Sequence, residues 1–370
     1  MKKSSLLLGL ALLCFNILIP KKSHSQTKAP STFIINGEIK AVKNGTLIRL
    51  MAIDELKILD SAYTVDGKFV LKGHVNEPTV CWLRCLDEYA IIEVENVAMT
   101  FNTTLKQMKL NYIASGGREQ TLQTELNKKL RPYEQIYLPL YDSLNNKLYK
   151  DTIDRKRMAK IFNTANDAYM NTYIAFGKRN INSYVGLDIV FRNRQKISKD
   201  SVMLLYNSLP TPLKNTNKAI SLKYYASATL AKKGEKFLDF NAVTIDGKPF
   251  KLSELKDKYI YLAFGSFSCG PCRMENKEIS DHYEQLSKSI HVVNFSLDVN
   301  KKEWELAAKQ DGIIWPNVSD LAGMAGKIKT LYNVQSMPTS FLIDKNGIIV
   351  ERFDGYNPEN LKNIKKIAGL

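Results

Sequence analysis

Residues 259–273, YIYLAFGSFSCGPCR, decide the fold of this 370-residue chain. Residues 259–264 are a continuous apolar and aromatic run, which predicts a buried strand. The segment from Arg273 to Lys288 has the pattern of a helix. Cys269 and Cys272 would therefore lie at the turn between a strand and a helix, where two thiols can close a disulfide and reopen it without unfolding the protein.

The two thiols differ in their expected chemistry. A cysteine at a helix N-terminus lies near unpaired backbone N–H groups and the positive end of the helix dipole, and both stabilise a thiolate. We therefore expect Cys269 to be the attacking thiol. Cys272, one turn into the helix and less exposed, would attack the mixed disulfide and release the reduced substrate. The Cys269–Cys272 disulfide would itself carry the electrons, so no cofactor is expected.

A zinc site and a structural disulfide are the two other interpretations of this motif. Zinc needs two more ligands. The remaining cysteines and the 4 histidines contain no second CxxC, CxxH or HxxxH pair. The sequence therefore predicts no metal site, and redox chemistry is the favoured interpretation. A purely structural disulfide stays open.

Residues 1–25 have the pattern of a secretory signal peptide. A basic start is followed by an apolar run, Leu6–Ile19, and then by small residues up to Ser25. Cleavage is expected near Ser25, which places the mature chain in the periplasm or cell envelope. Lipidation at Cys14 is disfavoured because the large Leu13 precedes it. No other segment is apolar enough to span a membrane.

Export places the chain in an oxidising compartment, where thiols do not stay reduced by default. We therefore expect an upstream membrane electron donor, and proteins with thiols or disulfides as substrates. Cys81 and Cys85 on the predicted strand 79–85 would face the same way, about 13 Å apart. That separation is beyond disulfide reach. We expect two buried apolar residues, while another pairing or a second redox function stays open.

Charge divides the mature chain into three parts. Residues 26–119 contain 11 Lys+Arg and 11 Asp+Glu, residues 120–233 contain 20 and 8, and residues 234–370 contain 18 and 18. Short alternating runs with turn signals such as Asp66-Gly67 predict a small antiparallel β domain in the first part. It contains no set of acid, base and nucleophile, so a binding or spacer module is expected.

The middle part shows helical periodicity, including a stretch from Lys214 to Lys233. Its positive excess would suit peripheral contact with an anionic surface, although solvated helix faces explain such charge equally well. Nucleic acid is a poor candidate partner for an exported chain with no recognition motif.

The last part alternates strands and helices, then ends with a hairpin at Asn346-Gly347 and a helix from Pro358. This order predicts an α/β architecture with a central mixed sheet.

The residues of this last part resemble the thioredoxin fold, in particular exported TlpA/ResA-type proteins that are grouped with the AhpC/TSA class. The matching segments are Cys269-Gly-Pro-Cys-Arg273, Trp315-Pro-Asn-Val-Ser-Asp320, Leu331-Tyr-Asn-Val334, Met337-Pro-Thr-Ser-Phe-Leu-Ile-Asp344 and Asn346-Gly-Ile-Ile-Val350. The first part resembles the β module called DUF4369, through Asp60-Ser-Ala-Tyr63 and Asp66-Gly-Lys-Phe69.

The resemblance implies a substrate-binding surface beside the disulfide. Pro338 would be a cis-proline, and the exposed backbone of Met337 would pair with an extended substrate segment, next to Gly270 and Pro271. A cis X–Pro bond creates the sharp turn that this requires.

Two positions depart from the thioredoxin pattern. Ser268 replaces the tryptophan that precedes the first cysteine, and Ala263 replaces the buried aspartate that manages the proton of the resolving thiol. The proton acceptor for Cys272 is therefore unassigned. Glu275 and Asp298 are close enough to be considered, but we expect a helix-surface carboxylate and a turn carboxylate, respectively.

The leading prediction is an exported thiol-disulfide oxidoreductase that reduces protein disulfides, since Gly-Pro between the cysteines resembles the reducing thioredoxins. A thiol peroxidase of the AhpC/TSA type is one alternative. Its peroxidatic cysteine would follow a Thr-x-x-Cys pattern, which residues 265–268 lack. A non-catalytic envelope scaffold is the other alternative.

Overall fold

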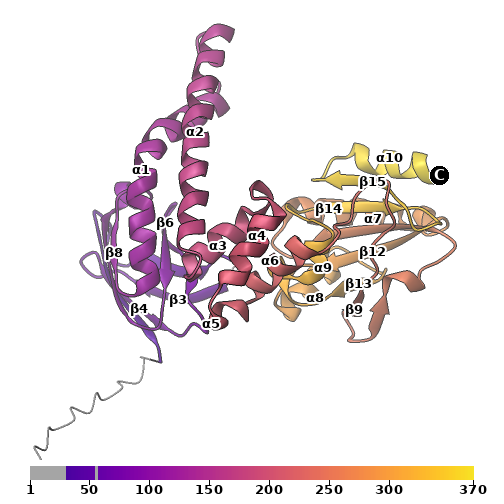
Figure 1. The fold of residues 1–370 in the computed structure, drawn as a ribbon, viewed down its shortest axis with the longest axis horizontal. Coiled ribbons are helices and arrows are strands. Elements are labelled where there is room, and N and C mark those ends of the chain that lie inside the picture. Colours follow the sequence, from indigo (N-terminus) through magenta and orange to yellow (C-terminus); the bar gives the residue numbers. More distant parts are fainter. Residues whose placement is uncertain (1–30, 55–56) are drawn as a thin grey trace, which may run out of the picture.

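The structure is a computed structural model that describes residues 31–54 and 57–370. The predicted signal peptide, residues 1–25, lies outside the described residues. Two lobes are joined by a group of helices, and a helical hairpin projects away from the first lobe (Figure 1).

The first lobe contains two four-stranded sheets. One has the order β4-β1-β7-β8 and the other has the order β3-β2-β5-β6. Most neighbours are antiparallel, as predicted, while β1 and β7 pair in parallel. The strands are β1 (Phe33–Lys40), β2 (Leu47–Ala52), β3 (Lys57–Tyr63), β4 (Lys68–Gly73), β5 (Thr79–Cys85), β6 (Glu88–Val94), β7 (Ala98–Thr104) and β8 (Ile113–Ser115).

Alternating side chains build the core of this lobe. Phe33, Ile35 and Ile39 of β1 are fully buried while their neighbours face outward, which is the period-two pattern of a strand with one covered face. Cys81 and Cys85 lie on the same face of β5 and are fully buried in the same core. Both therefore pack as the small apolar residues that the sequence predicts.

The middle of the chain is helical, as predicted. Helices α1 (Arg118–Asn145) and α2 (Thr152–Arg179) form the projecting hairpin. The helices α3 (Tyr184–Arg192), α4 (Lys199–Ser208), α5 (Thr211–Lys214) and α6 (Asn217–Ser227) lead to the second lobe. Side-chain caps from Ser183, Ser198 and Thr216 fix where α3, α4 and α6 begin. No helix in the described part of the chain is long and apolar enough to cross a membrane.

The predicted helical stretch to Lys233 is wrong at its end. α6 ends at Ser227, and the chain then runs along the second lobe. The Ala231 N–H donates to Leu331 O and the Gly234 N–H donates to Ile349 O, both at 2.8 Å. These main-chain bonds to a distant segment replace the helical ones.

The second lobe is built on a seven-stranded mixed sheet of order β10-β9-β13-β12-β11-β14-β15. β11, β12 and β13 are parallel to one another, and the other neighbours are antiparallel. Apolar clusters cover both faces of the central strands, so the predicted α/β architecture is confirmed. The strands are β9 (Asn241–Thr244), β10 (Pro249–Lys251), β11 (Tyr259–Gly265), β12 (Ile290–Ser296), β13 (Asn317–Ser319), β14 (Thr339–Ile343) and β15 (Ile349–Asp354), and the helices are α7 (Gly270–Leu286), α8 (Lys301–Gln310), α9 (Lys327–Leu331) and α10 (Glu359–Ala368).

Candidate active site at the start of helix α7

The CGPC motif lies between the central strand β11 and helix α7. β11 is buried on both faces, with Leu262 in one apolar cluster and Ala263 in the other. This explains why its sequence is an uninterrupted apolar run. Cys269 is the N-cap residue of α7, and its Sγ accepts a hydrogen bond of 3.2 Å from the Cys272 N–H. The motif therefore begins the helix, as the sequence predicts.

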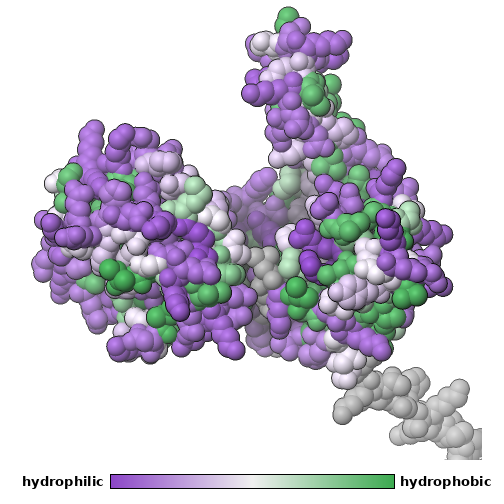
Figure 2. Space-filling view, turned by 180° about the vertical axis from the view of Figure 1, so that it is seen from behind, coloured by the Kyte–Doolittle hydropathy of each residue, from purple (hydrophilic) through white to green (hydrophobic). Residues whose placement is uncertain are grey.

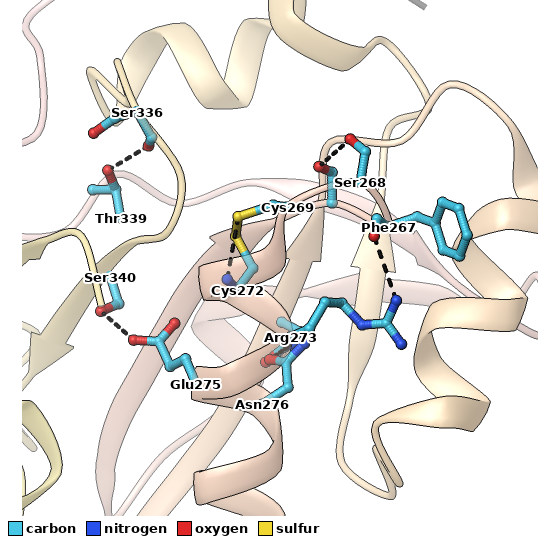
Figure 3. The surroundings of a disulfide bond; sticks show 12 residues. Phe267, Ser268, Cys269, Cys272, Arg273, Glu275, Asn276, Ser336, Thr339 and Ser340 are labelled. Carbon is cyan, nitrogen blue, oxygen red and sulfur yellow. Dashed lines mark hydrogen bonds between the residues drawn. A yellow bond between two sulfur atoms is a disulfide. The ribbon is translucent and has the colours of Figure 1, made fainter. Parts of the chain in front are cut away.

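The two cysteines form a disulfide, with their Cα atoms 5.2 Å apart (Figure 3). Cys272 is 2% exposed, whereas Cys269 is half-buried. The neighbouring Gly270 and Pro271 are exposed. Cys269 is therefore the more accessible of the two cysteines.

Gly265, the last residue of β11, leaves room for the buried thiol. A Cβ at this position would lie 3.2 Å from Cys272 Cβ and 3.3 Å from Cys272 Sγ. Sequence reasoning did not single out Gly265. A glycine at the end of an otherwise bulky buried strand is a signal for such a close approach.

We expect Gly265→Ala to destabilise the oxidised protein by about 1 to 3 kcal/mol, the usual cost of overpacking a core. Denaturant unfolding measures this difference. Gly270→Ala is the matched control, because a Cβ at Gly270 would have no neighbour within 4 Å. Equal losses of stability in the two variants would contradict the steric explanation.

Asp298 fixes the loop that precedes the motif. Both of its carboxylate oxygens accept from the Phe267 N–H, at 3.0 and 3.1 Å, and one accepts from Ser296 Oγ at 2.8 Å. It follows β12 in a turn, as expected, but it is only 8% exposed. Burial raises the pKa of Asp298. The expectation of an exposed carboxylate is therefore wrong, because the loop main chain uses it as an acceptor.

A buried network of polar side chains connects α7 to β12 and to the segments that follow α8. Arg273 Nε donates to both oxygens of Asp311, at 2.6 and 2.7 Å. Asp311 also accepts from Asn276 at 2.9 Å, Asn276 accepts from Asn294 at 2.7 Å, and Asn294 accepts from Trp315 Nε1 at 2.9 Å. This network connects the arginine after the second cysteine with the Trp-Pro segment, which is far from it in the sequence.

Glu275 is the carboxyl group that lies one helical turn beyond Cys272 (Figure 3). The expectation of a helix-surface carboxylate is wrong, since Glu275 is 5% exposed on the face that α7 turns to the sheet. Its Oε1 accepts from Tyr261 Oη at 2.7 Å and from Ser340 Oγ at 3.5 Å. Burial raises the pKa of Glu275 to about 7, although these two hydrogen bonds act in the opposite direction.

The Met337–Pro338 bond is cis, as the resemblance implies. Pro338 is buried just before β14, and its carbonyl accepts from the Gly355 N–H at 2.8 Å. Among residues 31–54 and 57–370, none hydrogen-bonds the main chain of Met337. Ser336 and Thr339 flank this bond and lie across from the disulfide (Figure 3).

The described part of the chain contains no group of three or more His, Cys, Asp or Glu side chains placed to hold a metal ion.

Two families match separate parts of the chain. Residues 233–352 match the AhpC/TSA family, and residues 33–123 match a domain of unknown function, DUF4369. The thiol-disulfide oxidoreductase ResA of Bacillus thuringiensis (strain Al Hakam) is 30% identical over 152 residues, which are 39% of this chain and 84% of that protein. The chain belongs to the ResA-type thiol-disulfide oxidoreductases.

Other members of the ResA family give similar matches. ResA from one strain of Bacillus cereus is 29% identical over 133 residues, which cover 36% of this chain and 75% of that protein. A putative thiol:disulfide interchange protein DsbE from Chlorobium tepidum has a solved structure. It is 30% identical, covers 38% of this chain and 99% of its own, and has a TM-score of 0.34.

These matches confirm three of the predictions from the sequence. The second lobe is thioredoxin-like, the first lobe belongs with DUF4369, and the protein is a thiol-disulfide oxidoreductase enzyme. The ResA match covers 39% of this chain, and the DUF4369 match covers residues 33–123.

Proposed function

We propose that this enzyme reduces protein disulfides outside the cytoplasm. The observation that carries the proposal is the unequal exposure of the two cysteines at the start of α7. In the reduced protein, the Cys269 thiolate attacks a substrate disulfide, and one substrate sulfur leaves as a thiolate. Cys272 then attacks the sulfur of Cys269 and releases the second substrate thiolate. Two electrons pass to the substrate, and the enzyme disulfide forms.

Cys272 must lose its proton before it can attack, and we assign Glu275 as the acceptor. It lies one turn away on the same helix, within the lobe, and its pKa of about 7 suits proton exchange at neutral pH. Ala263, which replaces the aspartate of the thioredoxin pattern, packs instead into an apolar cluster. The carboxyl group near Cys272 therefore comes from Glu275 on helix α7, whereas the thioredoxin pattern takes it from an aspartate at the position of Ala263 on strand β11.

The substrate chain binds across the exposed surface next to Cys269. The free main-chain groups of Met337 pair with an extended substrate segment, as in β-strand addition. Pro338 shapes this edge, and Gly270 and Pro271 border it on the other side.

We place the enzyme in the periplasm or cell envelope after cleavage of residues 1–25, with a membrane electron donor that re-reduces the disulfide. The three parts, residues 26–119, 120–233 and 234–370, act as the DUF4369-like module, the basic helical connector and the catalytic domain. No cofactor besides the disulfide is needed.

Equilibration with glutathione tests the reducing direction, and a potential near that of strong oxidants would overturn it.

Trapping substrates with Cys272→Ser is the direct test of the proposed function. Without the resolving thiol, Cys269 stays in mixed disulfides with its substrates, which can be purified and identified after export. Cys269→Ser is the matched control and should trap nothing. Absence of trapped proteins with Cys272→Ser under the same conditions would favour a scaffold instead.

We further propose that the hairpin tip, residues 144–161, contacts an anionic membrane surface. The tip contains six basic and two acidic residues. Leu148 and Ile153 are 68% and 79% exposed there. Figure 2 shows hydrophobic side chains among hydrophilic ones on this projection, which stands clear of both lobes. Basic groups beside exposed apolar ones are the features of a membrane-surface contact.

Binding to vesicles tests this contact. We expect Lys150→Glu with Lys156→Glu to weaken binding to phosphatidylglycerol-containing vesicles about tenfold or more, since each basic group near such a surface contributes about 1 kcal/mol. Lys178→Glu with Lys223→Glu makes the same charge change away from the tip. Equal losses in the two double variants would show that total charge, rather than the tip, drives binding.

A further inference from the structure

A cavity of about 450 Å³ lies in the first lobe, between the sheet β3-β2-β5-β6 and helices α1, α2 and α3. The elements that line it belong to the first lobe and the hairpin, whereas helix α7, where the disulfide lies, belongs to the second lobe (Figure 1). Its volume is within the range of sites for small molecules. The proposed redox function makes no use of this cavity.

Strand alternation explains the chemistry of the cavity wall. On β6, Ala90, Ile92 and Val94 point into the core between the two sheets. The alternate side chains, Tyr89, Ile91 and Glu93, therefore point to the opposite face, where they line the cavity.

Aromatic side chains form much of the remaining wall. Trp82 of β5 lies 6.3 Å from Tyr89, edge to face. On the helices, Tyr137 of α1 meets Tyr169 of α2 at 5.3 Å, and Tyr169 stacks on Tyr173 at 6.0 Å. With Tyr112, six aromatic rings thus line one space.

Glu93 is a deeply buried acidic residue of this wall. It is 4% exposed, and its main-chain N–H donates to Gln120 Oε1 at 2.9 Å. Its carboxyl group makes no hydrogen bond or ion pair within residues 31–54 and 57–370. A buried carboxyl group without a partner is costly, so such a group usually serves a ligand or a catalytic step.

Two of the nearby cations are already paired with other carboxylates, while a third, Lys109, has its ammonium 5.7 Å from the centre of the Tyr89 ring. Arg192 Nε lies 2.7 Å from Asp188, and Lys218 Nζ lies 2.8 Å from Asp54. Neither forms an ion pair with Glu93. Burial, reinforced by the negative charge of Asp188, raises the pKa of Glu93 to about 8. The positive charges of Lys218 and Arg192 act in the opposite direction from a longer range. Within the described part of the chain, no side chain forms an ion pair with Glu93.

We propose that this cavity binds a small organic cation with an aromatic or branched alkyl part, for which Glu93 is the counter-ion and the aromatic rings are the cage. The faces of Trp and Tyr rings attract cations, most strongly where water is excluded. An anion would meet an unpaired carboxyl group, and a neutral apolar ligand would leave that group unpaired. A cation would be attracted to the ring faces and would also pair with the Glu93 carboxylate.

The test compares a charged probe with an uncharged one by calorimetric titration of the full chain at pH 8.5, which is above the pKa of about 8 for Glu93. Benzyltrimethylammonium is the cation, and 2-phenylethanol is an uncharged aromatic of similar length. We expect the wild-type chain to bind benzyltrimethylammonium at least about tenfold more tightly than it binds 2-phenylethanol. Glu93→Gln should bind it about tenfold more weakly than the wild-type chain.

Two variants make the result specific. Glu125→Gln removes a carboxylate from the exposed face of α1, outside the cavity, and should bind like the wild type. Tyr137→Leu removes one half-buried ring and should weaken binding of the cation even if Glu93→Gln does not fold. Equal affinity for the two probes, no binding of either, or unchanged cation binding in Glu93→Gln or Tyr137→Leu overturns the proposal.

Discussion

Replacement of Cys269 by serine is expected to lower the rate of disulfide reduction about 1,000-fold or more, since a hydroxyl cannot replace the attacking thiolate. The half-buried Cys269 is the sulfur that a substrate reaches, and at the N-cap of α7 it is positioned for thiolate stabilisation. Cys272 stays behind it at 2% exposure and cannot substitute for it. Single-turnover reaction of the reduced protein with a fluorescent peptide disulfide measures the rate.

The control for this variant removes thiols that lie elsewhere. Cys81→Ala with Cys85→Ala deletes two buried thiols from the first lobe and should change the rate less than about twofold if the chain stays folded, because distant sites act independently. A Cys269→Ser variant that kept more than about a tenth of the activity would contradict the assignment of the attacking thiol.

Glu275→Gln is expected to slow the resolving step about 100-fold, the usual contribution of a positioned general base. In the wild type, the resolution rate should rise as the pH passes about 7, where Glu275 loses its proton. The variant should lack this rise. The measurement is the decay of a preformed mixed disulfide on Cys269 across pH 5 to 9. Glu284→Gln, an exposed position on the same helix, should behave like the wild type.

The same substitution should increase stability. The pKa of Glu275 is raised in the folded protein from its ordinary value of 4.5 to about 7, so the fold favours the neutral form. The free energy of unfolding of the wild type therefore falls as the pH rises through this interval. At pH 8 we expect Glu275→Gln to be more stable than the wild type by about 1 kcal/mol or more. A variant that is both less stable and unchanged in its pH profile would make Glu275 a structural residue only.

Local patterns were sufficient to predict much of the catalytic lobe. The apolar run of β11 must be buried on both faces, and the CGPC turn must begin a helix, because Pro271 suits a first helical turn. These features depend on neighbours in the sequence. The motif position and the order of strands and helices could therefore be predicted before the structure.

The surroundings of the disulfide depend on contacts that sequence patterns do not encode. Glu275 is buried because Ser340, 65 residues away, lies on the strand that α7 covers. Asp298 is buried because the Phe267 N–H, 31 residues earlier, needs an acceptor. Both carboxylates occupy positions where exposure is the usual outcome. Gly265 is important only because Cys272 packs against it in space.

In the first lobe too, the sequence pattern does not predict contacts between distant segments. Alternation predicts which face of β6 carries Glu93, but the pattern does not show that α1 and α2 enclose this face in aromatic rings. The three-dimensional arrangement turns an ordinary strand glutamate into a buried group that forms no ion pair with the described residues.

The central claim is that Cys269 attacks and Cys272 resolves. The most direct measurement is the alkylation rate of each thiol in the reduced protein at pH 7, with iodoacetamide as the reagent and peptide mass spectrometry to assign the site. The structure predicts that Cys269 reacts about 100-fold faster than Cys272, because it is accessible and its thiolate lies at the helix N-terminus. Equal rates, or faster alkylation of Cys272, would contradict the account.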